Sequence, residues 1–170
     1  YAPFELSESL MPDIKEQLAR CIAALGIDNT AINADFILKD GKVYVLEIGA
    51  RAGATCLPEL VSIFYGLDYY QYLILNCLGE KVPFSYSSVT PTVIETLMST
   101  KTGIVNSISI GELPSVVISL DIYPTIGDEV HSFKNAYDRI GTLILKGPHL
   151  NELFGECERI NEDIIKIDLI

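Results

Sequence analysis

Two acidic residues and an arginine stand in a mainly apolar stretch that contains several glycines. Asp35 lies in the run TAINADFIL, and Glu47 lies near the end of the run KVYVLEI, which continues into GARAGATC. Two carboxylates that reach one point can bind a hard divalent cation, and the planar guanidinium of Arg51 suits a phosphate or a carboxylate. These residue types indicate metal or phosphate chemistry, provided that the backbone brings them together.

The turn between the two runs decides whether the acids can meet. Asp40-Gly41 is a strong signal for a β-hairpin. A two-residue turn puts Asp35 and Glu47 on opposite faces, so no joint site forms. A three-residue loop with a bulge at the glycine instead puts Asn33, Asp35 and Glu47 on one face. Turn chemistry alone leaves both registers open.

A purely structural interpretation fits the same spacing. Glu47 and Arg51 then form a local ion pair, and Asp35 faces solvent at the edge of a sheet. The isolated pattern does not separate this interpretation from a ligand site.

The elements around this stretch follow from periodicity and from the positions of Gly and Pro. Apolar residues at helical spacing predict helices at 9–25, 57–65, 69–78 and 148–160. Short β-branched runs predict strands at 30–38, 42–48, 90–99, 103–110, 115–123, 139–147 and 163–170. The chain is therefore expected to be α+β. Near residue 82 the sequence changes from mainly helical patterns to short β-branched runs. This change predicts two domains, 1–82 and 83–170.

Composition excludes some classes of partner. The net charge of −11 argues against binding to nucleic acid or to an anionic membrane, because both need clustered basic residues. No apolar run is long enough to span a membrane. The four cysteines are far apart and form no metal-binding motif, which favours small buried thiols in a reducing, cytoplasmic setting.

The string INADFILKDGKVYVLEIGARAGATCLPELVSIFYGLDYY resembles the C-terminal half of the ATP-grasp domain, as in biotin carboxylase, the carbamoyl phosphate synthetase large subunit and L-amino-acid ligases. In that family a strand with an acid is followed by a strand that runs into a signature of the form E-I-N-x-R-x-G. The resemblance implies an antiparallel sheet with flanking helices, followed by a small strand-rich domain.

The resemblance also implies roles for individual residues. Asp35 and Glu47 would bind Mg²⁺ (or Mn²⁺) that bridges the phosphates of ATP. Arg51 would be a catalytic residue at the transferred phosphoryl group, and Asn33 and Gly53 would lie at the bound cofactor. The implied reaction is ATP-dependent activation of a carboxylate as an acyl phosphate, which an amine then attacks.

Gly49 departs from the family signature, which usually has an asparagine there as a further metal ligand. Three explanations stay open. A second metal ion is weakly held, or water or Asn33 compensates, or activity is reduced in this member.

The resemblance implies that the chain is the later part of a longer enzyme. Expected partners are ATP, a small carboxylate substrate and the missing N-terminal part of the same enzyme, with a homodimer as a candidate assembly. The 170-residue chain alone is expected to be inactive.

The alternative is a non-catalytic, acidic α+β binding or assembly module. A partner would then meet the tyrosines of the predicted helices, which are Tyr65, Tyr69, Tyr70 and Tyr72. The position of the two acids separates the hypotheses. Open, converging carboxylates favour a ligase, whereas diverging or sealed carboxylates favour the module.

Overall fold

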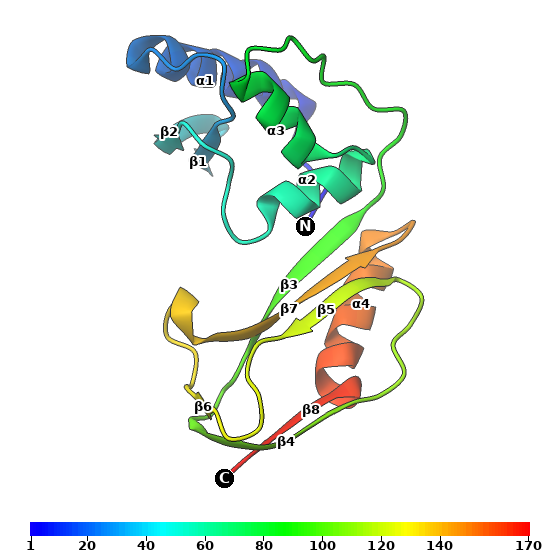
Figure 1. Cartoon of the computed structure of the whole chain (residues 1–170). Coiled ribbons are helices and arrows are strands. Elements are labelled where there is room, and N and C mark those ends of the chain that lie inside the picture. Colours follow the sequence, from blue (N-terminus) through cyan, green and yellow to red (C-terminus); the bar gives the residue numbers. More distant parts are fainter. The chain divides into compact units, whose positions relative to one another are not determined.

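The computed structural model describes all residues from 1 to 170, and its contacts divide the chain into two compact units. Pro3–Val89 forms the hairpin unit, and Thr90–Ile170 together with Tyr1–Ala2 forms the sheet unit. The mixture of helices and antiparallel strands confirms the predicted α+β class (Figure 1). The assignment of domains to 1–82 and 83–170 stays a prediction.

The hairpin unit contains one antiparallel strand pair and three α-helices, all at positions that the sequence predicts. A short 3₁₀ turn, η1, precedes the first helix. The elements are η1 (Glu8–Leu10), α1 (Met11–Leu25), β1 (Asn33–Lys39), β2 (Lys42–Gly49), α2 (Leu57–Tyr65) and α3 (Tyr69–Cys77).

Helix α1 begins with Pro12 in its first turn and ends at Gly26, whose φ of 64° is left-handed. Two of its polar side chains bind the backbone of β2. Asp13 Oδ2 accepts a hydrogen bond from Val43 N at 3.2 Å, and Gln17 Nε2 donates to Val43 O at 2.7 Å. The outward-facing peptide groups of Val43 are therefore satisfied by a helix, which protects this edge of the strand pair.

The sheet unit contains two antiparallel sheets of three strands each, in the orders β3-β7-β5 and β6-β4-β8. Its strands and helices are β3 (Thr92–Met98), β4 (Gly103–Ile110), β5 (Val117–Ile122), β6 (Glu129–Val130), β7 (Arg139–Lys146), α4 (Leu150–Arg159) and β8 (Ile165–Leu169). A 3₁₀ turn, η2 (Ala136–Asp138), precedes β7, and a π-helical turn, η3 (Ile160–Ile164), joins α4 to β8.

The core of the sheet unit lies between α4 and one face of the β3-β7-β5 sheet. Alternate residues of β3 and β7 point to this face, and they meet the apolar side of α4 and η3. The buried members are Val93, Leu97, Leu143, Leu145, Leu153, Cys157, Ile160 and Ile164. Burial of these side chains supplies the main apolar driving force of this unit.

Two further expectations concern the burial of the cysteine thiols and the lack of a membrane-spanning segment. Cys157 is buried as expected, but Cys21 and Cys56 are only partly buried and Cys77 is exposed, so the expectation of buried thiols was wrong for Cys77. Cys77 ends α3, a helix with no buried residue at all. None of the helices has both the length and the apolar character that crossing a membrane requires.

The difference between buried and exposed isoleucines gives a test of this core. Ile160 is 0% exposed in the core cluster, whereas Ile126 is 70% exposed in the same unit. We expect Ile160→Ala to lower the free energy of unfolding by about 2–5 kcal/mol. The matched change Ile126→Ala should cost less than about 0.5 kcal/mol. Urea titration measures both, and equal costs would contradict this description of the core.

Candidate functional site

The turn of the β1-β2 hairpin is a two-residue turn. Lys39 pairs with Lys42, and the intervening Asp40 and Gly41 have φ values of 52° and 71°. Two left-handed central residues are typical of a type I′ turn, whose twist matches that of the flanking strands. The three-residue register considered above is therefore wrong.

A bulge in β2 then changes the register halfway along the hairpin. Phe36 pairs with Val45, but the preceding Asp35 pairs with Glu47, so Leu46 has no partner. The extra residue shifts the pairing of β2 by one position from Glu47 onward. The side chains of this part of β2 therefore point to the opposite face from the one that an unbulged strand would give them. The expectation that a two-residue turn separates the acids is therefore also wrong, because Asp35 and Glu47 stand directly opposite each other.

Both carboxylates of this pair are exposed, and neither has a hydrogen bond or an ion pair within the chain. Side chains opposite each other in an antiparallel pair point to the same face with Cβ atoms about 4.5–5.5 Å apart. Two like charges at that separation repel each other unless a cation lies between them. The pair is therefore a candidate position for a divalent cation.

Arg51 is exposed and donates a hydrogen bond from Nη1 to the carbonyl oxygen of Ala52 at 2.9 Å. It forms no ion pair with Glu47, which contradicts the purely structural interpretation of the two residues. The rest of its guanidinium is available for an anion.

Asn33 and the loop after β2 meet at the open end of the hairpin. Asn33 pairs with Gly49, two positions from the Asp35–Glu47 pair on the same face. A Cβ atom on Gly53 would lie 2.9 Å from Asn33 Oδ1, so the loop folds back against this side chain. A Cβ atom on Gly49 would lie 3.7 Å from Arg51 Cγ. The structure thus places all five predicted site residues, together with Gly49, at the open end of the hairpin. These residues are Asn33, Asp35, Glu47, Arg51 and Gly53.

The loop reaches α2 through two residues that are left-handed without being glycine. Thr55 and Cys56 have φ values of 56° and 60°, and Pro58 follows in the first turn of the helix. Non-glycine residues in this conformation cost about 1–3 kcal/mol and are enriched at functional sites. Sequence patterns did not predict these two conformations, since neither threonine nor cysteine favours a left-handed backbone.

The number of acidic groups limits what the site can hold. The next acid along the chain after Glu47 is Glu59 on α2, and it already has a partner within the chain. It accepts a hydrogen bond from the hydroxyl of Tyr70, and this bond raises the pKa of Tyr70 to about 12. No group of three or more His, Cys, Asp or Glu side chains is arranged to hold a metal ion. Two carboxylates suit Mg²⁺, which takes one or two protein carboxylates and completes its shell with water and phosphate oxygens.

The tyrosines of the alternative hypothesis contact mainly one another and nearby phenylalanines. Tyr65 packs edge-on against Phe84 at 5.1 Å between ring centroids, and Tyr72 contacts the same ring at 5.5 Å. Tyr69 stacks on Tyr72 at 6.2 Å. This packing accounts for three of the four tyrosines without a partner protein.

Comparison with known proteins gives several matches. No family model matches the chain. A carbamoyl phosphate synthase large chain from Pasteurella multocida (strain Pm70) is 38% identical over 53 residues, which are 31% of this chain and 5% of that protein. The crystal structure of phosphoribosylglycinamide synthetase from Anaerococcus prevotii matches 99% of this chain with a TM-score of 0.89 and 30% identity.

Two further crystal structures share the fold over 99% of this chain at lower identity. L-amino acid ligase from Bacillus licheniformis has a TM-score of 0.81 and 20% identity, and N5-carboxyaminoimidazole ribonucleotide synthetase from Thermotoga maritima has 0.68 and 15%. The chain spans 44%, 43% and 45% of the three solved chains, which is less than half of each.

The two glycines beside Asn33 and Arg51 give a matched test of the loop geometry. A side chain on Gly53 would overlap Leu57 and approach Asn33 Oδ1, whereas one on Gly49 would meet only ordinary contacts. We expect Gly53→Ala to lower the free energy of unfolding by about 1–3 kcal/mol, and Gly49→Ala to change it by less than about 0.5 kcal/mol. Thermal unfolding measures both variants. A larger loss for Gly49→Ala would show that the loop lies elsewhere.

Proposed function

We propose that this chain, which has the fold of the ATP-grasp ligases, forms the later part of an enzyme that uses ATP to join a carboxylate to an amine. The fold and the similarity to ligases support carboxylate–amine ligation in general. The roles of individual residues, the metal ion and the need for a further part of the enzyme belong to the proposal.

One observation carries this proposal. The bulge at Leu46 places Asp35 opposite Glu47, and both carboxylates are exposed and without a protein partner. Repulsion makes such a pair unfavourable unless a cation is bound, so the arrangement favours a ligand function over a structural one. The binding-module alternative expects diverging or sealed acids, and it gains no support from this pair.

Asp35 and Glu47 would hold Mg²⁺ or Mn²⁺, and the donor set fits because a site with two carboxylates leaves room for phosphate oxygens. The metal ion, when bound, supplies positive charge at the phosphates of ATP. Asn33 and Gly53 would lie beside the nucleotide. Because Gly53 carries no side chain, the loop can pack closely against Leu57 and Asn33.

Arg51 would orient the transferred phosphoryl group and stabilise the charge that develops during transfer. In the proposed reaction the terminal phosphoryl group of ATP moves to a carboxylate oxygen, and ADP leaves. The amine nitrogen then bonds to the acyl carbon, phosphate leaves with the electrons of the carbon–oxygen bond, and the nitrogen loses a proton. The guanidinium is suited to this role because no carboxylate of the chain neutralises it.

Glu47→Gln tests the metal-binding role in the full-length enzyme. The amide keeps the size of the side chain but removes its charge. We expect ATP turnover to fall by about 10²-fold or more, as is typical when a preorganised electrostatic contact is lost. Glu80→Gln, at an exposed acid outside the hairpin, is the matched control and should leave turnover unchanged. An unaffected rate in Glu47→Gln would remove this residue from the mechanism.

Calorimetry on the isolated 170-residue chain tests the need for a further part of the enzyme. Two carboxylates and one arginine at an exposed hairpin offer few contacts to a nucleotide, so we expect only weak binding of Mg-ATP and no turnover. Asp35→Asn should weaken the remaining heat signal. Tight binding by the isolated chain would contradict the proposal that another part of the enzyme completes the site.

A further inference from the structure

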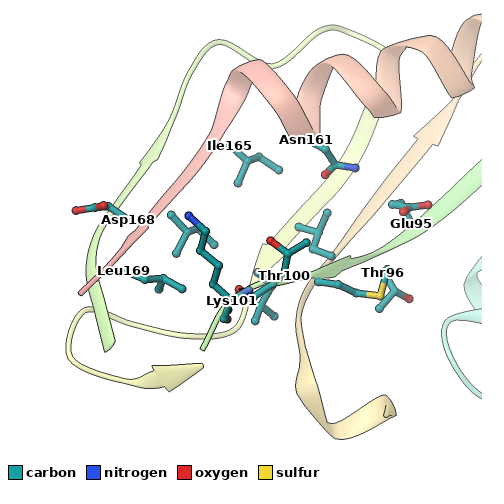
Figure 2. Close-up of a pocket in the computed structure, with 13 residues that line it drawn as sticks. Glu95, Thr96, Thr100, Lys101, Asn161, Ile165, Asp168 and Leu169 are labelled. Atoms are coloured by element: carbon teal, nitrogen blue, oxygen red, sulfur yellow. Dashed lines mark hydrogen bonds between the residues drawn. The ribbon is translucent and has the colours of Figure 1, made fainter. Parts of the chain in front are cut away.

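A cavity of about 520 Å³ lies within the sheet unit, apart from the residues of the hairpin site. It is bounded by the end of β3, the β3–β4 turn, η3 and β8 (Figure 2). Its aliphatic lining consists mainly of Leu97, Ile140, Ile165, Ile167 and Leu169. The remaining lining is mostly polar and comes from Glu95, Thr96, Ser99, Thr100, Lys101, Asn161 and Asp168. Concave sites of this size that combine aliphatic and polar side chains are typical of small-molecule binding.

Glu95 is the unusual group in this lining. It stands on the core face of β3 between the buried Val93 and Leu97, and it pairs across the sheet with the fully buried Leu143. It has no hydrogen bond or ion pair. A carboxylate in apolar surroundings without a partner is costly, so this position is suited to a cationic donor from a ligand.

The electrostatics around Glu95 agree with this description. Burial is the main cause that raises the pKa of the Glu95 carboxyl. Burial, and then the negative charge of Glu95, raise the pKa of the Cys157 thiol to about 11. Cys157 therefore stays a neutral thiol and does not compensate the carboxylate.

Lys101 lines the cavity from the β3–β4 turn. The Ser99 hydroxyl donates to Lys101 O at 2.6 Å and accepts from Lys101 N at 3.1 Å, which holds this turn in shape. The Lys101 ammonium has no hydrogen bond or ion pair. The nearby Asp168 accepts a hydrogen bond from Asn106 Nδ2 at 2.9 Å, and in Figure 2 its carboxylate points away from the cavity.

The two unpaired charges are thus opposite in sign and separated by aliphatic walls. In Figure 2 Glu95 lies at the right of the labelled residues, and Lys101 lies apart from it, nearer the middle. A metal ion would find only the carboxylate of Glu95 inside the cavity, because the other acid of the lining, Asp168, is bonded to Asn106 and points away. An inorganic anion would meet the charge of Glu95. A purely apolar molecule would leave both charges unpaired.

We propose that this cavity binds a small zwitterion with an aliphatic middle, whose ammonium group meets Glu95 and whose carboxylate meets Lys101. The walls contact the aliphatic part, and the charged ends confer specificity. This site is independent of the proposed ligase reaction, because it uses no residue of the hairpin.

Binding of 6-aminohexanoate to the whole chain tests the proposal, with hexanoate and hexylamine as probes that each lack one charged end. We expect saturable changes in the amide NMR signals of the cavity residues with 6-aminohexanoate. Hexanoate, which lacks the ammonium that meets Glu95, should bind about tenfold more weakly. Hexylamine, which lacks the carboxylate that meets the exposed Lys101, should bind about two- to fivefold more weakly. Equal affinity of all three probes, or signal changes spread over the surface, would overturn the proposal.

Two variants assign the ends of the ligand. Glu95→Gln should weaken binding of 6-aminohexanoate by about tenfold and leave hexanoate binding unchanged or stronger. Lys101→Met should weaken it by about two- to fivefold, because this lysine is exposed. Glu112→Gln and Lys146→Met change exposed residues outside the cavity and should have no effect.

Thermal unfolding of each variant separates a lost contact from a lost fold. Glu95→Gln should not lower the unfolding temperature at neutral pH, because it removes a charge whose burial is unfavourable. Unchanged affinity in a folded Glu95→Gln variant would refute the assignment of the ammonium end. If that variant does not fold, the comparison of hexanoate with 6-aminohexanoate on the unchanged chain still decides whether an ammonium group contributes.

Discussion

The bulge at Leu46 is the constraint on which the candidate site depends. The type I′ turn fixes the first half of the hairpin so that, without an extra residue, Asp35 would stand opposite Leu46 and Glu47 would point to the other face. One unpaired residue reverses this and places two negative charges side by side. The chain gains no stability from that arrangement. The proposed metal site gives this arrangement a function, and the loop with Arg51 and Gly53 lies next to it.

Much of the fold could be predicted from the sequence, because local patterns carry the information. Helical spacing and the left-handed Gly26 define α1, and β-branched runs between turn residues define β3 and β7. The strand orders could not be read in the same way. Periodicity tells which face of a strand is buried, but β7 pairs with β3 and β5 across long stretches of chain, and no local pattern names those partners. The short β6 was missed because two residues carry no periodicity.

The sequence indicates the residue types of the candidate site but not its geometry. Glu47 and Arg51 are recognisable because a charged residue in an apolar or glycine-rich stretch needs an explanation. The strand register could not be predicted, because Leu46 is an ordinary apolar residue and leucine has no preference for β-bulges. The left-handed Thr55 and Cys56 are hidden for a similar reason. The charge of Glu95 becomes unusual only when the tertiary structure puts α4 against its face of the sheet.

The hydrogen bonds of Asp13 and Gln17 to Val43 have a consequence for how the hairpin can grow. They occupy outward peptide groups of β2 near the turn, so an additional strand finds no free partner there. Close to the turn, a further strand could therefore pair only with the outer edge of β1. The strand that carries Asp35 would become an inner strand, while the one that carries Glu47 would stay at the rim, and the two acids would come to experience unequal access of water.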